Sequence, residues 1–195
     1  MKSSDILVVV DMQNDFIDGS LGTEGAQKIV DKVVEKVADF SGKAVIFTKD
    51  THDNKYLNTY EGKKLPVMHC IKGTQGWEIS NKIKTCVDKY DTSIILKDTF
   101  GTFILSDRIK AYQYSKDGTY IDADKLIIEI IGLCTDICVV SNAIILKAAF
   151  PNSQIIVDAS CCAGTTPENH EKALDVMRSC HITVINDIRK GLTNE

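Results

Sequence analysis

Residues 126–139 of the chain read Leu-Ile-Ile-Glu-Ile-Ile-Gly-Leu-Cys-Thr-Asp-Ile-Cys-Val. The apolar run stops at Gly132, and a helix-like pattern begins at Asp136, two residues before Cys138. A strand that turns sharply into a helix is typical of a parallel sheet, and it places the first helical turn at the carboxyl edge of that sheet. Unpaired backbone N–H groups and the helix dipole favour an anion there. Cys138 is therefore a candidate nucleophilic thiolate, although a lone cysteine in such a place is as often a small core residue.

Strand-like and helix-like segments alternate along the rest of the chain. The apolar runs are mostly unbroken, as expected of strands that are covered on both faces. This alternation implies right-handed crossover connections. We therefore predict the α/β class, with a doubly wound, Rossmann-like parallel sheet of about six strands and helices on both faces. The predicted strands are 6–10, 44–48, 93–96, 126–131, 155–157 and 182–185, and the clearest predicted helices are 26–40, 136–149 and 167–178.

The composition favours one globular domain over residues 1–195, since 44% of the residues are hydrophobic and 26% are charged. The net charge is −4 and the 23 basic residues are scattered, so we expect a small-molecule partner and no nucleic acid. The longest N-terminal apolar run, Ile6–Val10, is too short for a signal peptide or a membrane span. Seven cysteines, an odd number, indicate reduced thiols and a cytoplasmic protein without a membrane partner.

Four of the predicted strands end at residues that can carry chemistry. Asp11 follows the first strand, Asp50 the second and Lys97 the third, and the fourth leads to Cys138. Each of these residues has an ordinary structural explanation, because aspartates cap turns and lysines extend to solvent at strand ends. Together, however, they place a nucleophile, a base and a charge partner at one edge of the sheet.

A long polar segment, residues 50–77, carries two of the four histidines. Asp50 and His52 lie on the same side of an extended stretch, and His69 can close a mixed N/O site with Glu61 between them. Such donors suit a divalent metal ion, for which we name zinc first and iron or manganese as alternatives. A solvated polar loop is the competing interpretation.

Two common nucleotide-binding motifs are absent. The first strand leads into Asp11-Met-Gln-Asn-Asp15 without a GxGxxG pattern, and the chain contains no Walker A sequence. The spacing of the two aspartates also differs from the Asp-x-Asp start that an aspartyl-phosphate phosphatase would need.

The motifs taken together resemble those of the isochorismatase-like cysteine hydrolases, and among them the nicotinamidase/pyrazinamidase branch. Residues 11–16 match the D-x-Q-N-D-F block of this family, and residues 50–52 match its D-x-H metal segment. Residues 66–76 resemble the P-x-H-C-x-x-G-T-x-G block, Lys97 matches the lysine at a strand end, and residues 132–139 match G-x-x-T-D-x-C-V. The similarity spans nearly the whole chain, with the motifs in the right order.

The resemblance implies a catalytic triad of Asp11, Lys97 and Cys138. Asp11 would take the thiol proton, and the thiolate would attack an amide carbon to form a thioester. The backbone N–H groups of Cys134 and Cys138 would form the oxyanion hole. Lys97 would hold the two charges in place, and the family has a cis peptide bond at the position of Leu133-Cys134.

The resemblance also implies the substrate and the metal. Nicotinamidases hydrolyse nicotinamide to nicotinate and ammonia in NAD salvage, a route of pyridine nucleotide biosynthesis, and hold a metal ion beside the site. Phe16, Leu65 and Leu133 would bind the substrate, with Phe16 stacked on the pyridine ring and Leu65 where the family often has an aromatic residue.

Two alternatives remain at this point. One is a cysteine amidase that acts on another small amide or on a carbamoyl compound, and the other is a catalytically silent domain that binds a ligand or partner. Family members often form dimers or larger assemblies, so the resemblance also implies a homo-oligomer.

Overall fold

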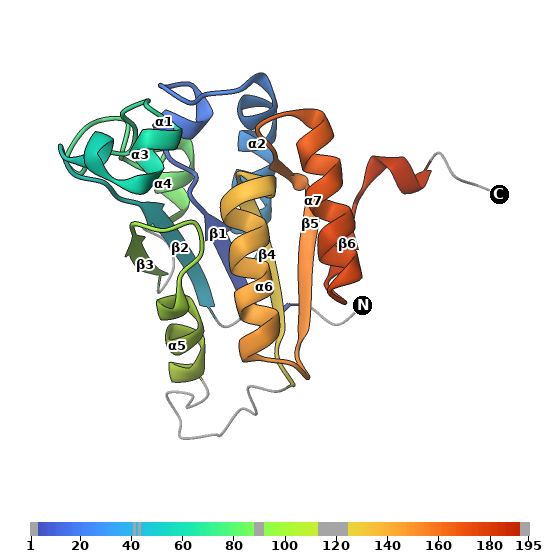
Figure 1. Ribbon diagram of the computed structural model, residues 1–195. Coiled ribbons are helices and arrows are strands. Elements are labelled where there is room, and N and C mark those ends of the chain that lie inside the picture. Colours follow the sequence, from blue (N-terminus) through green and yellow to red (C-terminus); the bar gives the residue numbers. More distant parts are fainter. Residues whose placement is uncertain (1–3, 41, 43, 88–91, 113–124, 192–195) are drawn as a thin grey trace.

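The computed structural model describes residues 4–40, 42, 44–87, 92–112 and 125–191. Within them, six strands form one sheet in the order β3-β2-β1-β4-β5-β6 (Figure 1). Every neighbouring pair is parallel, which confirms the predicted doubly wound α/β fold. The strands are β1 (Ile6–Val10), β2 (Ala44–Asp50), β3 (Thr92–Lys97), β4 (Ile127–Leu133), β5 (Gln154–Ala163) and β6 (Thr183–Ile185).

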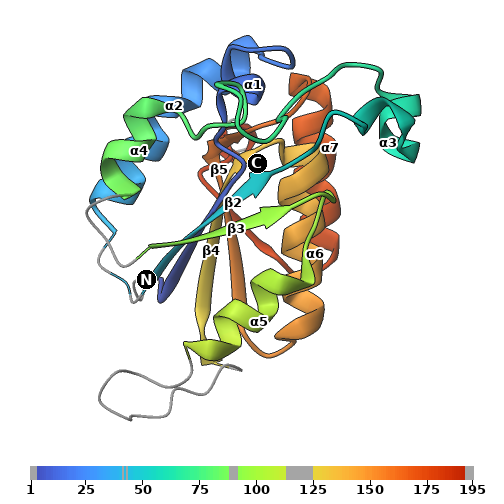
Figure 2. The same ribbon diagram turned by 90° about the vertical axis from the view of Figure 1, so that its left-hand side faces the viewer.

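Helices cover both faces of this sheet. Figure 2 shows α2 and α4 on one face and α5, α6 and α7 on the other. None of the helices in the described ranges is long and apolar enough to span a bilayer. The helices are α1 (Asn14–Ile17), α2 (Glu24–Ala38), α3 (Tyr60–Lys64), α4 (Asn81–Val87), α5 (Phe103–Ala111), α6 (Val140–Ala149) and α7 (Pro167–Ser179), with shorter helical turns η1 (Tyr56–Asn58), η3 (Thr135–Val139) and η4 (Ile188–Gly191).

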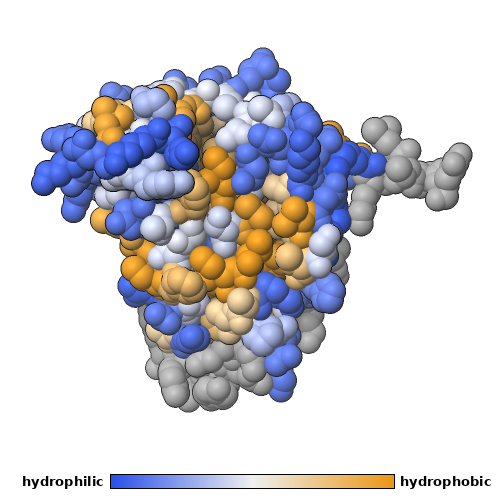
Figure 3. Space-filling view, in the orientation of Figure 1, coloured by the Kyte–Doolittle hydropathy of each residue, from blue (hydrophilic) through white to orange (hydrophobic). Residues whose placement is uncertain are grey.

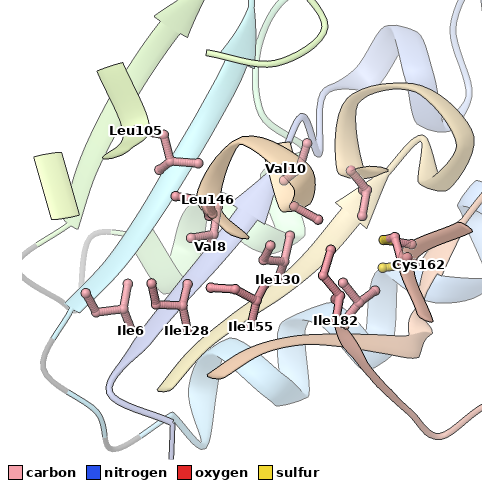
Figure 4. Packing of buried hydrophobic residues seen from close by; sticks show 14 of the residues in the cluster. Ile6, Val8, Val10, Leu105, Ile128, Ile130, Leu146, Ile155, Cys162 and Ile182 are labelled. Atoms are coloured by element: carbon pink, nitrogen blue, oxygen red, sulfur yellow. The ribbon is translucent and has the colours of Figure 1, made fainter. Parts of the chain in front are cut away.

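The central strand β1 shows why the apolar runs are unbroken. All five of its residues are fully buried, because successive side chains point to opposite faces and a helical layer covers each face. Ile6, Val8 and Val10 pack into one core cluster, while Leu7 and Val9 pack into the other. Figure 4 shows the first cluster, in which side chains from β1, β4 and β5 meet those of α5 and α6.

The helices begin at residues that the sequence marks. Thr23 caps α2 by accepting a hydrogen bond from the Ala26 N–H, and Thr166 caps α7 in the same way, with Pro167 at its first position. Ile29, Val33 and Val37 form the buried face of α2. These two helices therefore lie within two residues of their predicted ranges.

Some predicted segments differ from the observed ones. The strand predicted at 155–157 extends over Gln154–Ala163, and the helix predicted at 136–149 begins with the π-helical turn η3. No helix was predicted at α5, because Phe103 and Ile104 are exposed while Leu105 and Ile109 are buried, and this distribution obscures the helical period. All the described cysteines are free thiols, and Cys180 is exposed, whereas a cysteine beside a strand is usually a buried core residue.

The direction of strand addition reverses between β1 and β4. The chain winds from β1 through β2 to β3 in one direction, and from β4 to β6 in the other. Ligands of doubly wound sheets bind at such a switch point, beyond the carboxyl ends of the strands. Asp11 follows β1, and η3 with Cys138 follows β4, so both residues lie at this point.

Candidate active site

Three side chains from separate strands meet at the switch point. Lys97, the last residue of β3, places Nζ 2.6 Å from Asp11 Oδ2 and 3.5 Å from Cys138 Sγ. The Asp11 carboxylate also hydrogen-bonds to the Cys138 thiol. All three residues are at most 5% exposed. The structure therefore brings together the three residues that were predicted as a triad.

The position of Asp11 depends on an unusual backbone conformation and on Thr48. Its φ is 47°, in the left-handed region that aspartate tolerates better than most residues. The Thr48 hydroxyl, on the neighbouring strand β2, donates to Asp11 Oδ1 over 2.6 Å and accepts from the Asp11 N–H over 3.2 Å. These bonds occupy one carboxylate oxygen and leave the other to face Lys97.

Cys138 lies in η3, the turn that joins β4 to α6. The residue before this turn is Cys134, and the Leu133-Cys134 peptide bond is cis, as the resemblance implied. The backbone N–H groups of Cys134 and Cys138 belong to the start of a helix, where N–H groups lack intrahelical partners. These are the two N–H groups that the resemblance implies as oxyanion donors.

Helix α7 holds this turn from the other side. Thr135 Oγ1 lies 2.8 Å from His170 Nδ1 on α7. The Asp136 carboxylate accepts hydrogen bonds from both the backbone N–H and the hydroxyl of Thr165, just before that helix. The η3 turn is thus anchored at two successive residues close to the nucleophile.

Burial dominates the titration of the triad. It raises the pKa of the Cys138 thiol well above its ordinary value, the Asp11 charge adds to the rise, and Lys97 partly opposes it. Burial likewise raises the pKa of Asp11, although Lys97 acts against this. Burial disfavours the charged form of Lys97, but Asp11, Cys138 and Asp50 together keep its pKa above the ordinary value. A protonated thiol next to a carboxylate follows, in place of the acidified thiol that the helix terminus and the lysine suggested.

A second group of side chains lies next to the triad. Ligand atoms of Asp50, His52 and His69 lie within 4.8 Å of one another. Asp50 Oδ2 is 3.0 Å from His52 Nε2 and 3.5 Å from His69 Nε2. Glu61 Oε1 is 3.9 and 3.8 Å from the same two nitrogens. The other oxygen of Asp50 lies 3.4 Å from Lys97 Nζ, which joins the two groups.

This group fits a divalent metal ion. His69 donates from Nδ1 to the Val67 carbonyl over 2.8 Å, so its Nε2 carries a free lone pair. His52 Nε2 is buried and makes no well-directed hydrogen bond to the residues that the structure describes. Burial opposes ionisation of Asp50, but the two histidines and Lys97 outweigh it and hold the pKa of this carboxyl below its ordinary value. An anionic oxygen and two imidazole nitrogens that converge in this way are donors that suit a divalent transition-metal ion.

Two residues that the sequence analysis missed hold these ligands. The ring of Tyr56, which is 1% exposed, lies 4.6 Å from the His52 ring and 4.8 Å from the His69 ring. The buried amide of Gln13 donates to the Asp50 carbonyl over 2.8 Å and accepts from the Asp50 N–H over 2.7 Å. Gln13 lies inside the quoted 11–16 motif, which was its only signal in the sequence. No pattern marked Tyr56.

The predicted substrate-binding residues have different environments. Phe16 is 7% exposed, and its ring lies 5.6 Å from the His69 ring, so it borders the metal-ligand group. Leu65 follows α3 and is 36% exposed. The side chain of Leu133 has no exposed surface and packs in the same core cluster as Phe16, which places it behind the site.

A doubly wound sheet with a buried Asp-Lys-Cys group at its switch point, beside an Asp-His-His group, defines a cysteine-type hydrolytic enzyme. The isochorismatase domain model matches residues 5–187, and the chain belongs to the isochorismatase family.

Curated relatives lie in the nicotinamidase branch. The chain is 27% identical over 177 residues to a nicotinamidase of Acinetobacter baylyi, with 78% of this chain and 79% of the relative aligned. It is 32% identical over 179 residues to a protein of Arabidopsis thaliana described as a probable inactive nicotinamidase, with 84% and 83% aligned.

Solved structures share the fold over nearly the whole chain. A nicotinamidase/pyrazinamidase from Bacillus subtilis is 26% identical with a TM-score of 0.78, covering 93% of this chain and 98% of that one. A Pyrococcus horikoshii pyrazinamidase in complex with zinc has 25% identity, a TM-score of 0.72 and the same coverage. An N-carbamoylsarcosine amidase from Thermoplasma acidophilum has 27% identity and a TM-score of 0.68, covering 93% and 95%.

Proposed function

We propose that the chain is an amidohydrolase that cleaves nicotinamide to nicotinate and ammonia through a thioester on Cys138. The observation that carries this proposal is the adjacency of the two buried groups, joined by Lys97 between Asp11 and Asp50. The relationship to nicotinamidases supports the substrate. The acid product, nicotinate, would connect the reaction to NAD salvage and so to pyridine nucleotide biosynthesis.

The first half of the reaction forms the thioester. The Cys138 thiol gives its proton to the Asp11 carboxylate as Sγ attacks the amide carbon, and Lys97 stabilises the negative charge on either group. The carbonyl oxygen becomes an oxyanion, which accepts hydrogen bonds from the backbone N–H groups of Cys134 and Cys138. Each such donor contributes about 2.7–4 kcal/mol. Protonated Asp11 then gives its proton to the departing nitrogen, and ammonia leaves as the C–N bond breaks.

The second half returns the enzyme to its starting state. Ionised Asp11 takes a proton from water as the water oxygen attacks the thioester carbon. The C–S bond breaks and the carboxylic acid leaves, while the proton held by Asp11 returns to Cys138. A carboxyl group whose pKa is raised by burial suits both directions of this transfer, because it holds a proton more readily than an ordinary aspartate and can still give it up.

Asp50, His52, Glu61 and His69 would hold a divalent ion, for which zinc is proposed and iron or manganese are alternatives. When bound, the ion would act as a Lewis acid beside the site and could accept the lone pair of the pyridine nitrogen of the substrate. Phe16 borders the candidate ligand group and would pack on the ring, and Leu65 would supply a further substrate contact, while the buried Leu133 would support the pocket from behind.

The deciding experiment measures ammonia release from nicotinamide by the purified protein, before and after chelation and after metal is restored. Turnover that is lost on chelation and regained with metal is the expected result. If the protein released ammonia from other small amides but not from nicotinamide, the proposed triad would be supported and the proposed substrate would be wrong.

A second candidate is a cysteine amidase for a carbamoyl compound. The similarity to an N-carbamoylsarcosine amidase favours it, as does Leu65 in place of a ring-packing aromatic residue. Including N-carbamoyl amino acids in the amide panel distinguishes the two substrates directly. The third possibility, a catalytically silent domain, gains weight from the probably inactive relative; it predicts no turnover of any amide.

We propose that residues 1–195 form one domain, with residues 50–77 as its metal-binding loop, in a cytoplasmic protein. The match of the family model to residues 5–187 and the free thiols support this.

We also propose a homo-oligomer. Figure 3 shows apolar side chains on the face of α5 and α6, where Phe103 is 75% and Ile104 55% exposed, and such patches are typical of protein interfaces. Light scattering, measured as the protein elutes from a size-exclusion column, tests the homo-oligomer. The mass of a single chain would contradict it.

A further inference from the structure

The nucleophile and its cationic partner come from strands that do not touch. Lys97 ends β3, which pairs with β2 at the edge of the sheet that the described residues form, and Cys138 follows β4. Strands β2 and β1 lie between them, so no ladder of backbone hydrogen bonds joins β3 to β4 directly, although Lys97 Nζ lies 3.5 Å from Cys138 Sγ. A contact outside the sheet also relates the segment that follows β3 to the turn that follows β4.

Asn142 makes such a contact. This residue lies one helical turn after Cys138 and has no exposed surface. Its Nδ2 donates to the Cys138 carbonyl over 2.8 Å and to the Phe100 carbonyl over 3.2 Å. Its Oδ1 accepts from the Thr102 N–H over 3.0 Å. The amide therefore binds the nucleophile turn on one side and the segment just beyond Lys97 on the other.

The segment after Lys97 is pressed closely against α6 at this point. A Cβ atom on Gly101 would lie 2.6 Å from Ile145 Cδ1 and 3.1 Å from the backbone of Ser141. Thr102, which the Asn142 amide holds, also caps α5 through its hydroxyl. One buried side chain thus connects the end of β3, the start of α5 and the turn that carries Cys138.

We propose that Asn142 is a positioning residue, which bridges the Cys138 turn to residues 100–102 and thereby holds Lys97 beside the nucleophile. This inference rests on the proposed triad. All three partners of its amide are backbone groups, so the bridge transmits position and takes no part in proton transfer. The charged groups that face Cys138 are Asp11, Lys97 and Asp50, and Lys97 is the one whose approach the bridge controls.

Two substitutions distinguish a bridge between the two segments from a hydrogen bond to the Cys138 carbonyl alone. In Asn142→Ala both sides of the bridge are lost. In Asn142→Thr the hydroxyl can still bond to the carbonyl four residues earlier, that of Cys138, but it is too short to reach residues 100–102. Ser106→Ala is the matched control, because this buried serine on α5 donates to the Phe103 carbonyl within its own helix.

The first measurement is the rate at which iodoacetamide modifies Cys138, followed by peptide mass spectrometry across a range of pH. Loss of the lysine contact should move the midpoint upward by about one pH unit in both Asn142 variants, which is a tenfold lower thiolate fraction at fixed pH. The Ser106 variant should keep the wild-type profile. Thermal unfolding of each variant shows whether it is folded, and Asn142→Thr, which nearly preserves side-chain volume, keeps the test available if Asn142→Ala does not fold.

The second measurement is turnover of nicotinamide. Both Asn142 variants should lose about tenfold or more in kcat, since misplacement by about 1 Å can cost about 10²-fold, with KM within about twofold of wild type. A wild-type alkylation profile in either variant would overturn the proposal, and so would an equal shift in Ser106→Ala. The alkylation result does not depend on the substrate, so failure of the nicotinamide assay in the wild type would contradict the proposed function and leave this test intact.

Discussion

At the scale of single residues, the site depends on groups whose burial changes their chemistry. The Cys138 thiol would be a weak nucleophile in isolation, because burial and the Asp11 carboxylate both raise its pKa. Lys97 is the only one of the three neighbouring charges that favours the thiolate. The reaction therefore requires the proton to pass to Asp11 while the carbon–sulfur bond forms.

Substitution of the nucleophile tests the covalent step. Cys138→Ala removes a small, buried side chain that packs in a core cluster, so we expect the fold to persist and ammonia release from nicotinamide to disappear. Circular dichroism and thermal unfolding check the fold. Turnover at the wild-type rate would show that Cys138 forms no thioester.

Substitution of the base should separate two properties of the thiol. In Asp11→Asn the negative charge that raises the pKa of Cys138 is gone while Lys97 remains. We therefore expect faster alkylation of Cys138 near neutral pH but turnover reduced by about 10²-fold or more, because no group carries the proton to the leaving nitrogen. If turnover kept pace with the faster alkylation, Asp11 would have no role in proton transfer.

At the scale of elements, hydrogen bonds and ring contacts hold the 50–77 segment around the candidate metal ligands. The His52 N–H donates to the Cys70 carbonyl and the His52 carbonyl accepts from the Lys72 N–H, so the two ends of the segment lie side by side. The ring of Tyr56 packs against both histidine rings, which also contact each other, and its hydroxyl donates to the Leu65 carbonyl. These contacts orient the candidate ligands, and such support favours tight and selective binding.

Removal of one candidate ligand tests the assignment of the metal site. His52→Ala deletes a nitrogen that lies within 4.8 Å of the other two ligand atoms, and we expect bound metal to fall at least tenfold in protein dialysed against a limiting metal concentration. His181→Asn is the matched control, since His181 is exposed and far along the chain, and its φ of 60° suits asparagine. Equal metal content in His52→Ala and the control would assign the ion to other residues.

At the scale of the whole molecule, a second buried ionic group joins helix α2 to the sheet. Lys36 on α2 lies 2.7 Å from both Glu129 on β4 and Asp158 on β5. The two carboxylates are almost completely buried, and Ser4, Ser160 and Asn186 complete their hydrogen bonds. Although burial acts against ionisation, the bonds from Lys36 and its neighbours hold the pKa of Asp158 below its ordinary value.

This group predicts how stability responds to mutation. Lys36→Met leaves two buried carboxylates without a cation and should lower the free energy of unfolding by about 3 kcal/mol. Lys82→Met removes an exposed pair with Asp31 between α4 and α2 and should cost less than about 1 kcal/mol. Urea unfolding at pH 7 measures both; equal small losses would mean that Glu129 and Asp158 do not need Lys36.

The same group predicts a dependence on pH. Because the folded pKa of Asp158 is depressed, its stabilisation is complete above its unfolded value of about 3.9 and is lost as the pH falls through the folded value. Wild-type stability should therefore decline from about pH 5 downward, and Lys36→Met should decline less steeply. Parallel curves for the two proteins would show that the pair contributes no pH dependence.

Much of the architecture could be predicted from local patterns. Unbroken apolar runs marked the six strands, and the helical period marked α2 and α7, because these signals depend on neighbouring residues only. Helix α5 was missed since its apolar residues are divided between the core and the surface. The motifs around Asp11, Asp50, Lys97 and Cys138 also indicated the site, since parallel strands present their carboxyl ends at one edge.

The sequence by itself determined the class of fold, the residues that can react and their placement at strand ends, because each of these is a property of a short segment. Only the tertiary structure decided that β1 and β4 are neighbours, and so that Asp11 and Cys138 share a switch point. It also decided that burial raises the pKa of the thiol, that Tyr56 packs against both histidines, and that Asn142 bridges two segments. These properties depend on contacts between residues distant in the chain and on the exclusion of water, which local patterns do not record.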